Sequence, residues 1–149
     1  MNKNDKDQFI KFAHALADVA KAHTLKYFRL DSVSIHSKEE LTFDPVTIAD
    51  IEVQSKINET IKKYFPKHSI LGEEACVKNI SDYQWCIDPI DGTKSFIQGF
   101  PIWGTLISLS QKDKIILGIA DIPALDERYL GYSKLAYKIK NGKKTRLKV

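Results

Sequence analysis

The stretch "WCIDPIDGTKSF" (residues 85–96) decides the fold, because it joins an apolar strand-like run to a polar turn. Two carboxylates, Asp88 and Asp91, lie three residues apart in it. Pro89 stands between them, and Gly92 and Thr93 follow directly. Proline and glycine are typical of a tight turn. Two acids at the end of a strand are also typical of a site that holds something charged, and both interpretations stay open at this point.

The apolar spacing changes along the chain, from helical before this stretch to strand-like around and after it. Residues 5–28 carry apolar side chains at steps of three and four, and a second such pattern runs from Thr47 to about Tyr64, where Pro66 ends it. Short β-type runs separated by turn residues follow, from "HSILGEE" to "AYKIK". This order predicts an α+β fold with two N-terminal helices packed on a largely antiparallel sheet.

The composition is that of an ordinary globular protein. The chain has 149 residues, of which 43% are hydrophobic and 28% charged, which is enough for one domain with a real core. No apolar run approaches the roughly 20 residues that span a bilayer, and the polar start "MNKNDKDQF" is unlike a signal peptide. We therefore expect a cytoplasmic protein with no membrane partner.

The net charge of +4 is unevenly distributed, because residues 133–149 carry seven Lys or Arg and no acid. A basic segment of this kind can bind nucleic acid. The segment "KIKNGKKTRLK" also contains an Asn-Gly turn between strand-like residues, which is typical of a solvated hairpin. Because no aromatic residues alternate with the charges from Lys138 onward, we expect no nucleic-acid partner.

Acids occur at three places where a strand or helix begins or ends. The segments are "DPVTIAD", "ILGEE" and "IDPIDGT", and the acids are Asp50, Glu73, Glu74, Asp88 and Asp91.

Each place has a purely structural explanation. Thr47 and Asp50 have the spacing of a capping box. The two glutamates are explained equally well as turn charges. Asp88 can start a turn with the proline that follows it, and Asp91 can cap a short helix that begins near Thr93.

Together the three places favour a metal site, because acids at the ends of adjacent elements can converge in space. Carboxylates with water and substrate phosphate are the ligands that Mg²⁺ prefers. Two such ions about 3.5–4 Å apart stabilise in-line displacement at phosphorus. Asp88 is well placed to bridge two ions, since it ends a strand. The Gly-Thr pair offers backbone N–H groups to a phosphate, and the Thr93 hydroxyl can hydrogen-bond an attacking water.

The segments "DPVTIAD", "GEE" and "WCIDPIDGTKSF", in this order, resemble the inositol monophosphatase superfamily of Mg²⁺-dependent phosphatases. In finer detail, "FDPVTIAD", "FPKHSILGEE" and "DGTKSFIQGFPIWGTLISL" are most similar to its histidinol-phosphate phosphatases. The resemblance implies that the helices and sheet form the first half of a layered αβαβα sugar-phosphatase fold. It also implies a homodimer, by analogy alone.

The resemblance implies metal ligands at four positions. Glu73 and Asp88, with the carbonyl oxygen of Ile90, would hold a first Mg²⁺. Asp88 and Asp91 would hold a second.

It also implies the groups that handle water and phosphate. Asp50 and Thr93 would orient and deprotonate the attacking water, as the catalytic pair. Gly92 and Thr93 would contact the substrate phosphate through their backbones. Glu74 would be a supporting acid that acts behind the ligands or through water.

The implied activity is hydrolysis of a phosphate monoester by two-metal in-line attack of water. Histidinol phosphate, an intermediate of histidine biosynthesis, is the substrate that the resemblance favours. An inositol-1-phosphate or broad sugar-phosphate phosphatase is the alternative within this class. A non-catalytic remnant that binds metal or phosphate is the alternative from another class.

The resemblance covers the N-terminal part of the family's length. Members continue through a second α/β domain with a W-D-x-x-A-type segment, whose Asp completes the second metal site. We therefore expect residues 1–149 to be the N-terminal metal-binding domain of a phosphatase, with the C-terminal α/β domain missing. On this interpretation the truncated chain alone has weak or no turnover.

Overall fold

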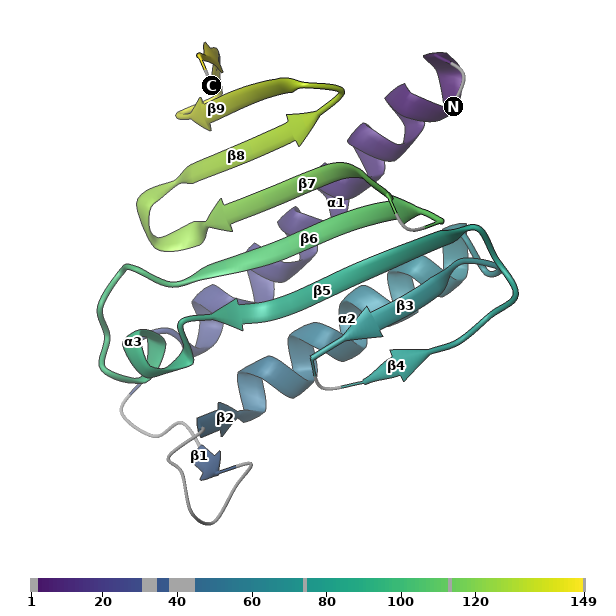
Figure 1. Ribbon diagram of the computed structural model, residues 1–149. Coiled ribbons are helices and arrows are strands. Elements are labelled where there is room, and N and C mark those ends of the chain that lie inside the picture. Colours follow the sequence, from purple (N-terminus) through teal and green to yellow (C-terminus); the bar gives the residue numbers. More distant parts are fainter. Residues whose placement is uncertain (1–2, 31–34, 38–44, 74, 113, 149) are drawn as a thin grey trace.

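The protein is an α+β domain in which two long helices cover one face of a sheet (Figure 1). Helix α1 (Lys3–Tyr27) and helix α2 (Ile48–Tyr64) lie against each other and against the central strands. The predicted fold class is confirmed, and both helices lie within two residues of the predicted bounds. The computed structural model describes residues 3–30, 35–37, 45–73, 75–112 and 114–148.

The main sheet has eight strands in the order β10-β9-β8-β7-β6-β5-β3-β4. Every neighbouring pair is antiparallel except β3 and β5, which are parallel. The strands are β3 (Ser69–Gly72), β4 (Cys76–Val77), β5 (Tyr83–Asp91), β6 (Gly104–Gln111), β7 (Lys114–Ile122), β8 (Glu127–Tyr132), β9 (Leu135–Lys140) and β10 (Lys143–Leu147).

Four short elements lie beside the main sheet. Strands β1 (Ile35–Ser37) and β2 (Pro45–Thr47) pair antiparallel with each other. Helix α3 (Thr93–Ile97) follows β5 directly, and a 3-10 turn, η1 (Pro123–Leu125), joins β7 to β8.

Helix α2 begins and ends where its sequence predicts. Thr47 is the N-cap: its hydroxyl accepts the N–H groups of Ala49 and Asp50, and its own N–H donates to the Asp50 carboxylate at 2.8 Å. This capping box satisfies donors that the helix cannot pair internally. The helix ends before Pro66, whose ring cannot continue it. None of the helices in the described part of the chain is long and apolar enough to cross a membrane.

The core lies between the helices and the sheet, since alternate residues of each strand point toward the helices. Each such large apolar side chain stabilises the fold by roughly 1.5–3 kcal/mol when fully buried. The buried set comprises Phe9, Ala13, Leu16, Ala17, Ala20, Val53, Ile57, Ile61, Ile70, Trp85, Ile87, Ile107, Leu109, Leu117, Ile119 and Leu130.

A second, smaller apolar cluster fixes α3 at the end of β5. Phe96 of α3 packs edge-on against Trp103 with ring centroids 4.9 Å apart, and both rings contact Phe28 near the end of α1. Ile90 and Ala49 are buried in the same cluster. The turn after β5 therefore rests on packed aromatic rings.

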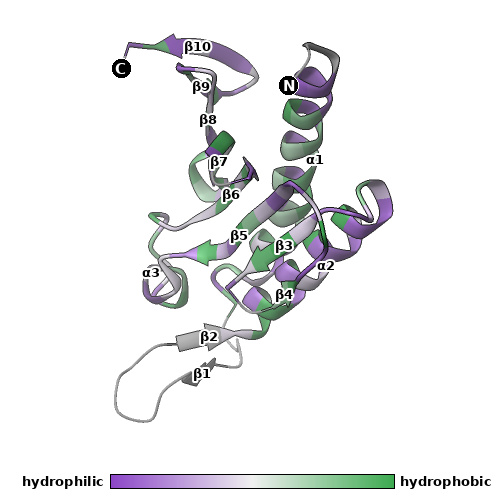
Figure 2. Ribbon diagram, turned by 45° about the vertical axis from the view of Figure 1, so that its right-hand side comes forward, coloured by the Kyte–Doolittle hydropathy of each residue, from purple (hydrophilic) through white to green (hydrophobic). Residues whose placement is uncertain are grey.

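The other face of the sheet is covered by none of the described elements (Figures 1 and 2). Its central strands present small and apolar residues, among them Cys86, Leu106, Gly118 and Ala120, beside a shallow apolar hollow of about 560 Å³. Leu106 is 37% exposed and Ile115 is 74% exposed. Contiguous exposed apolar surface of this kind is uncommon on monomeric soluble proteins and often marks a surface that another domain or chain covers.

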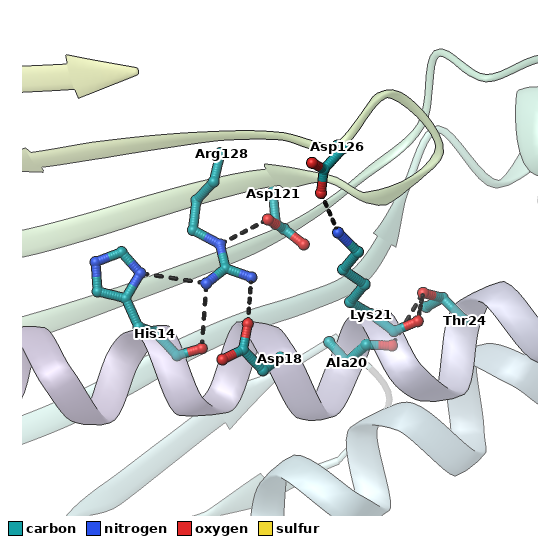
Figure 3. Close-up of polar contacts among 8 residues, drawn as sticks. All are labelled: His14, Asp18, Ala20, Lys21, Thr24, Asp121, Asp126 and Arg128. Atoms are coloured by element: carbon teal, nitrogen blue, oxygen red, sulfur yellow. Dashed lines mark hydrogen bonds and ion pairs between the residues drawn. The ribbon is translucent and has the colours of Figure 1, made fainter. Parts of the chain in front are cut away.

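An ionic network, buried at Asp121 and exposed at Asp18, joins α1 to strands β7 and β8 (Figure 3). The Arg128 guanidinium donates to Asp121 at 2.7 Å and to Asp18 at 2.8 Å, and it lies 3.2 Å from Nδ1 of His14. Asp121 is only 3% exposed. The network links α1 to the sheet on its helix-covered side, and no local sequence pattern predicts it.

Candidate active site

The parallel pairing of β3 with β5 brings Glu73 beside Asp88. The register places Gly72 opposite Ile87, and the N–H of Glu73 donates to the Ile87 carbonyl at 3.1 Å. The next positions along the two strands are Glu73 and Asp88, so the two carboxylates lie on the same, open side of the sheet. The charge of Glu73 and a hydrogen bond that protonated Asp88 donates to the Glu73 carboxylate both raise the pKa of Asp88.

The turn that carries Glu73 requires a glycine. A Cβ at Gly72 would lie 2.4 Å from Oε1 of Gln54 and 2.5 Å from the carbonyl oxygen of Ala75. Only glycine allows the backbone to pass this close to its neighbours. The backbone at Gly72 therefore packs closely against Gln54 of α2, directly before Glu73.

A β-bulge in β5 brings Asp91 to the same side as Asp88. In an ideal strand, residues three apart point to opposite faces. Here Asp88 pairs with Leu106 and Asp91 pairs with Gly104, so three steps along β5 match two steps along β6. The extra residue restores the parity, and both carboxylates face the open side.

These residues line one cavity of about 240 Å³ at the end of β5. Its walls are Glu73, Asp88, Ile90, Asp91, Gly92, Thr93 and Lys94. The cavity therefore contains every predicted metal ligand and both predicted phosphate-binding residues.

The first turn of α3 forms one wall of this cavity. Gly92 is its N-cap with φ of +85°, a conformation that favours glycine. No side chain caps this helix, so the alternative in which Asp91 is a helix cap is wrong. The Thr93 hydroxyl donates to the Ile90 carbonyl at 3.0 Å, which leaves its oxygen lone pairs able to accept from water.

Asp50 lies next to the cavity without lining it. It is 1% exposed in the first turn of α2, and its carboxylate accepts both the N–H and the hydroxyl of Thr47. Its charge nevertheless contributes to the raised pKa of Asp88. The capping box and a role near the cavity are therefore compatible. Glu74, predicted as a supporting acid, lies outside the described residues.

Asp88 has an unusual electrostatic environment for a carboxylate. Burial first, then the charge and hydrogen bond of Glu73, and then the charges of Asp91 and Asp50 raise its pKa to about 7. Its Oδ1 is buried and has no hydrogen-bond partner among the described residues. A divalent cation bound among these carboxylates would offset their mutual repulsion. Carboxylate oxygens are also the ligands that Mg²⁺ prefers, so these residues fit Mg²⁺. Among the described residues, however, no group of three or more His, Cys, Asp or Glu side chains is already placed so that it could hold a metal ion.

Lys94 is a cavity residue that the sequence analysis did not include among the site residues. It is the one cation among the cavity's described lining residues and lies at the second position of α3. The signal was present in the sequence, as a basic residue directly after the Gly-Thr pair.

The fold and the cavity define a class of protein: layered α+β domains with an acid-lined pocket where a parallel strand pair ends. The chain belongs to the inositol monophosphatase family, whose model matches residues 5–149.

Individual relatives agree with this assignment. Over 150 residues the chain is 41% identical to "Bifunctional phosphatase IMPL2, chloroplastic" of Arabidopsis thaliana, which covers 99% of this chain and 40% of that protein. It is 35% identical to a histidinol-phosphatase of Streptomyces coelicolor, with 80% of this chain and 46% of that protein covered. The crystal structure of extragenic suppressor protein suhB from Bartonella henselae shares the fold, with a TM-score of 0.84 at 24% identity, over 95% of this chain and 54% of that one. The chain thus spans about half the length of the proteins it matches.

Binding of Mg²⁺ by residues 1–149 is expected to weaken as the pH falls through about 7. Asp88 must lose its proton to act as a ligand, and its pKa is about 7. Each pH unit below that value should therefore weaken binding by up to about tenfold. Titration calorimetry at pH 8.0, 7.0 and 6.0 measures this. A flat affinity over that range would mean that Asp88 does not bind the ion.

Proposed function

We propose that this protein is the N-terminal, metal-binding part of a Mg²⁺-dependent phosphomonoester hydrolase. The observation that carries the proposal is the convergence of Glu73, Asp88 and Asp91 on one cavity beside the Gly92-Thr93 turn. Three carboxylates brought together from two strands repel one another unless a cation lies among them. Family membership supports the same conclusion.

In this proposal the carboxylates hold one or two Mg²⁺ ions. Glu73, Asp88 and the Ile90 carbonyl would hold the first, and Asp88 and Asp91 the second. Bound Mg²⁺ would supply charge neutralisation of the phosphate and of the leaving alkoxide. Because Ile90 is buried and its carbonyl already accepts from Thr93, its position is fixed before any ligand arrives.

The remaining residues would handle water and phosphate. The Thr93 hydroxyl donates a hydrogen bond to the Ile90 carbonyl oxygen, so the Thr93 oxygen would accept a hydrogen bond from the attacking water and orient it. Asp50, held by Thr47, would act with Thr93 as the general base. The backbone N–H groups of Gly92 and Thr93 would hold the phosphate oxygens at the uncapped start of α3.

Histidinol phosphate is the substrate we favour. The similarity to a histidinol-phosphatase over most of this chain supports it. The family's name supports the alternative, an inositol-1-phosphate or broad sugar-phosphate phosphatase.

We also propose that a second α/β domain completes the pocket in the working enzyme. Two observations support this: relatives are about twice as long, and the open face of the sheet is apolar. Residues 1–149 alone would then retain Mg²⁺ binding and have weak or no turnover.

The test is a phosphate-release assay of residues 1–149 at high protein concentration, with L-histidinol phosphate and inositol-1-phosphate, with and without Mg²⁺. We expect slow release that requires Mg²⁺, is abolished by Asp88→Asn and is faster with histidinol phosphate. Calorimetry on the same samples measures binding of Mg²⁺ and of inorganic phosphate.

Three outcomes separate the candidates. Faster release from inositol-1-phosphate favours the alternative substrate class. Binding of Mg²⁺ or phosphate with no release above the Asp88→Asn background agrees both with a fragment that needs its second domain and with the non-catalytic remnant. The same assay on a version that includes the proposed second domain then separates the two, because only the remnant would stay inactive. Robust turnover, at the rate of a typical complete enzyme (about 1–1,000 per second), would contradict the need for a second domain.

A further inference from the structure

The geometry of the cavity depends on one irregularity, the bulge between Asp88 and Asp91. Without the extra residue, Asp91 would point to the helix-covered side of the sheet, away from Asp88 and Glu73. A bulge disrupts the hydrogen-bond ladder locally, so its backbone groups need partners from elsewhere. Pro89, within the bulge, has no N–H to contribute to the ladder. Something outside β5 must therefore hold this segment.

Thr105 of β6 supplies the missing partner. It is fully buried, and its hydroxyl donates to the Pro89 carbonyl at 2.8 Å. On β6, Thr105 lies between Gly104, which pairs with Asp91, and Leu106, which pairs with Asp88. It therefore lies directly opposite the bulge in β5. A single side chain thus spans the irregular step and satisfies the carbonyl there.

The backbone of β6 around Thr105 packs closely against β7. Thr105 pairs with Asp121 in β7. A Cβ at Gly104 would lie 2.8 Å from the Asp121 carbonyl oxygen and 2.9 Å from Cδ1 of Ile122, so β6 and β7 approach closely at this point. The Thr105 hydroxyl is therefore presented from a strand that packs closely against its neighbour β7 at this point.

We propose that Thr105 is a positioning residue that holds the Pro89 bulge and so sets Asp88 and Asp91 on the same face of the sheet. Its importance for metal binding rests on the proposed function. The hold on the bulge itself does not, because it is a property of the fold.

Three variants test the proposal. Thr105→Val keeps the shape and removes the donor, and Thr105→Ser keeps the donor. Thr24→Val is the matched control, because Thr24 is also fully buried and its hydroxyl also donates to a carbonyl, that of Ala20 at 2.9 Å.

Two measurements are made on each variant. The first is Mg²⁺ affinity by calorimetry at pH 8, where Thr105→Val should bind roughly tenfold more weakly, as is typical when a group supporting a metal ligand is lost. The second is amide hydrogen exchange without metal, where the amides of Ile90 and Asp91 should exchange roughly tenfold faster in Thr105→Val. Thr105→Ser and Thr24→Val should resemble the wild type in both.

Each outcome is informative. Mg²⁺ binding by Thr105→Val equal to that of the wild type, or equally weakened in Thr24→Val, would overturn the positioning role. If the wild type and Asp88→Asn bind Mg²⁺ equally poorly, the proposed function fails. The exchange data still decide on Thr105, because unchanged exchange at Ile90 and Asp91 in Thr105→Val would overturn the inference on its own.

Discussion

An Asp88→Asn variant is expected to lose Mg²⁺ binding and, without metal, to be more stable than the wild type at pH 8. Asp88 is the proposed shared ligand, and loss of a direct ligand should exceed the 10- to 100-fold that supporting groups typically cost, so we expect about 100-fold weaker binding or worse. The two effects have opposite signs because the same carboxylate attracts the cation and is repelled by Glu73, Asp91 and Asp50.

The stability gain follows from the raised pKa of Asp88. A carboxyl group with a higher pKa in the folded than in the unfolded state binds more protons when folded, so it destabilises the fold above that pKa. The penalty is fully present above about pH 7 and disappears as the pH falls from 7 toward the unfolded value near 4. The acids titrate together, which reduces the effect of any one of them. We therefore expect Asp88→Asn to raise the free energy of unfolding by on the order of 1–2 kcal/mol at pH 8.

Thermal unfolding with and without Mg²⁺, at pH 8 and at pH 5, measures both effects. The gain of Asp88→Asn should be large at pH 8, small at pH 5, and reversed in saturating Mg²⁺. A variant that is less stable than the wild type at pH 8 without metal would show that Asp88 is not under repulsion in the folded protein.

Replacement of Arg128 is expected to have the largest effect on stability. An Arg128→Met variant leaves Asp121 buried without its cationic partner, and Oδ2 of Asp121 already lacks a hydrogen bond from the described part of the chain. Removal of one partner of a buried ion pair typically costs about 3–5 kcal/mol. For a domain of this size we expect Tm to fall by roughly 8–15 °C.

Two further variants separate the buried charge from simple loss of packing. Asp121→Asn in the Arg128→Met background should recover part of the loss, because no charge remains buried. Lys56→Met removes an exposed pair with Glu59 and should cost less than about 1 kcal/mol. If the double variant is as unstable as Arg128→Met, the loss comes from packing of the arginine stem.

The helices and the candidate acids could be predicted because their signals are local. The Thr47–Asp50 capping box and the proline after α2 are read directly from neighbouring residues. The strand segments were likewise recognisable from their apolar runs and turns. The resemblance to a known family then supplied the roles of the acids.

The geometry that brings the acids together could not be predicted from the residues. Asp88 and Asp91 are three apart, which on an ideal strand means opposite faces, and only the bulge reverses this. Bulges and the parallel β3–β5 pair depend on pairing between distant segments, which periodicity does not encode. Thr105 and Arg128 were missed for the same reason, since their partners lie 16 residues away and up to 114 residues away.

The basic end of the chain, considered first as a nucleic-acid patch, forms the outermost strand of the sheet. Strand β10 is exposed along Lys143, Lys144 and Arg146, and an edge of this kind would otherwise offer free backbone groups to another copy. Like charges on two approaching edges repel, so we expect these basic side chains to oppose edge-to-edge pairing of two copies of the sheet. High salt would weaken this protection, because it screens the repulsion.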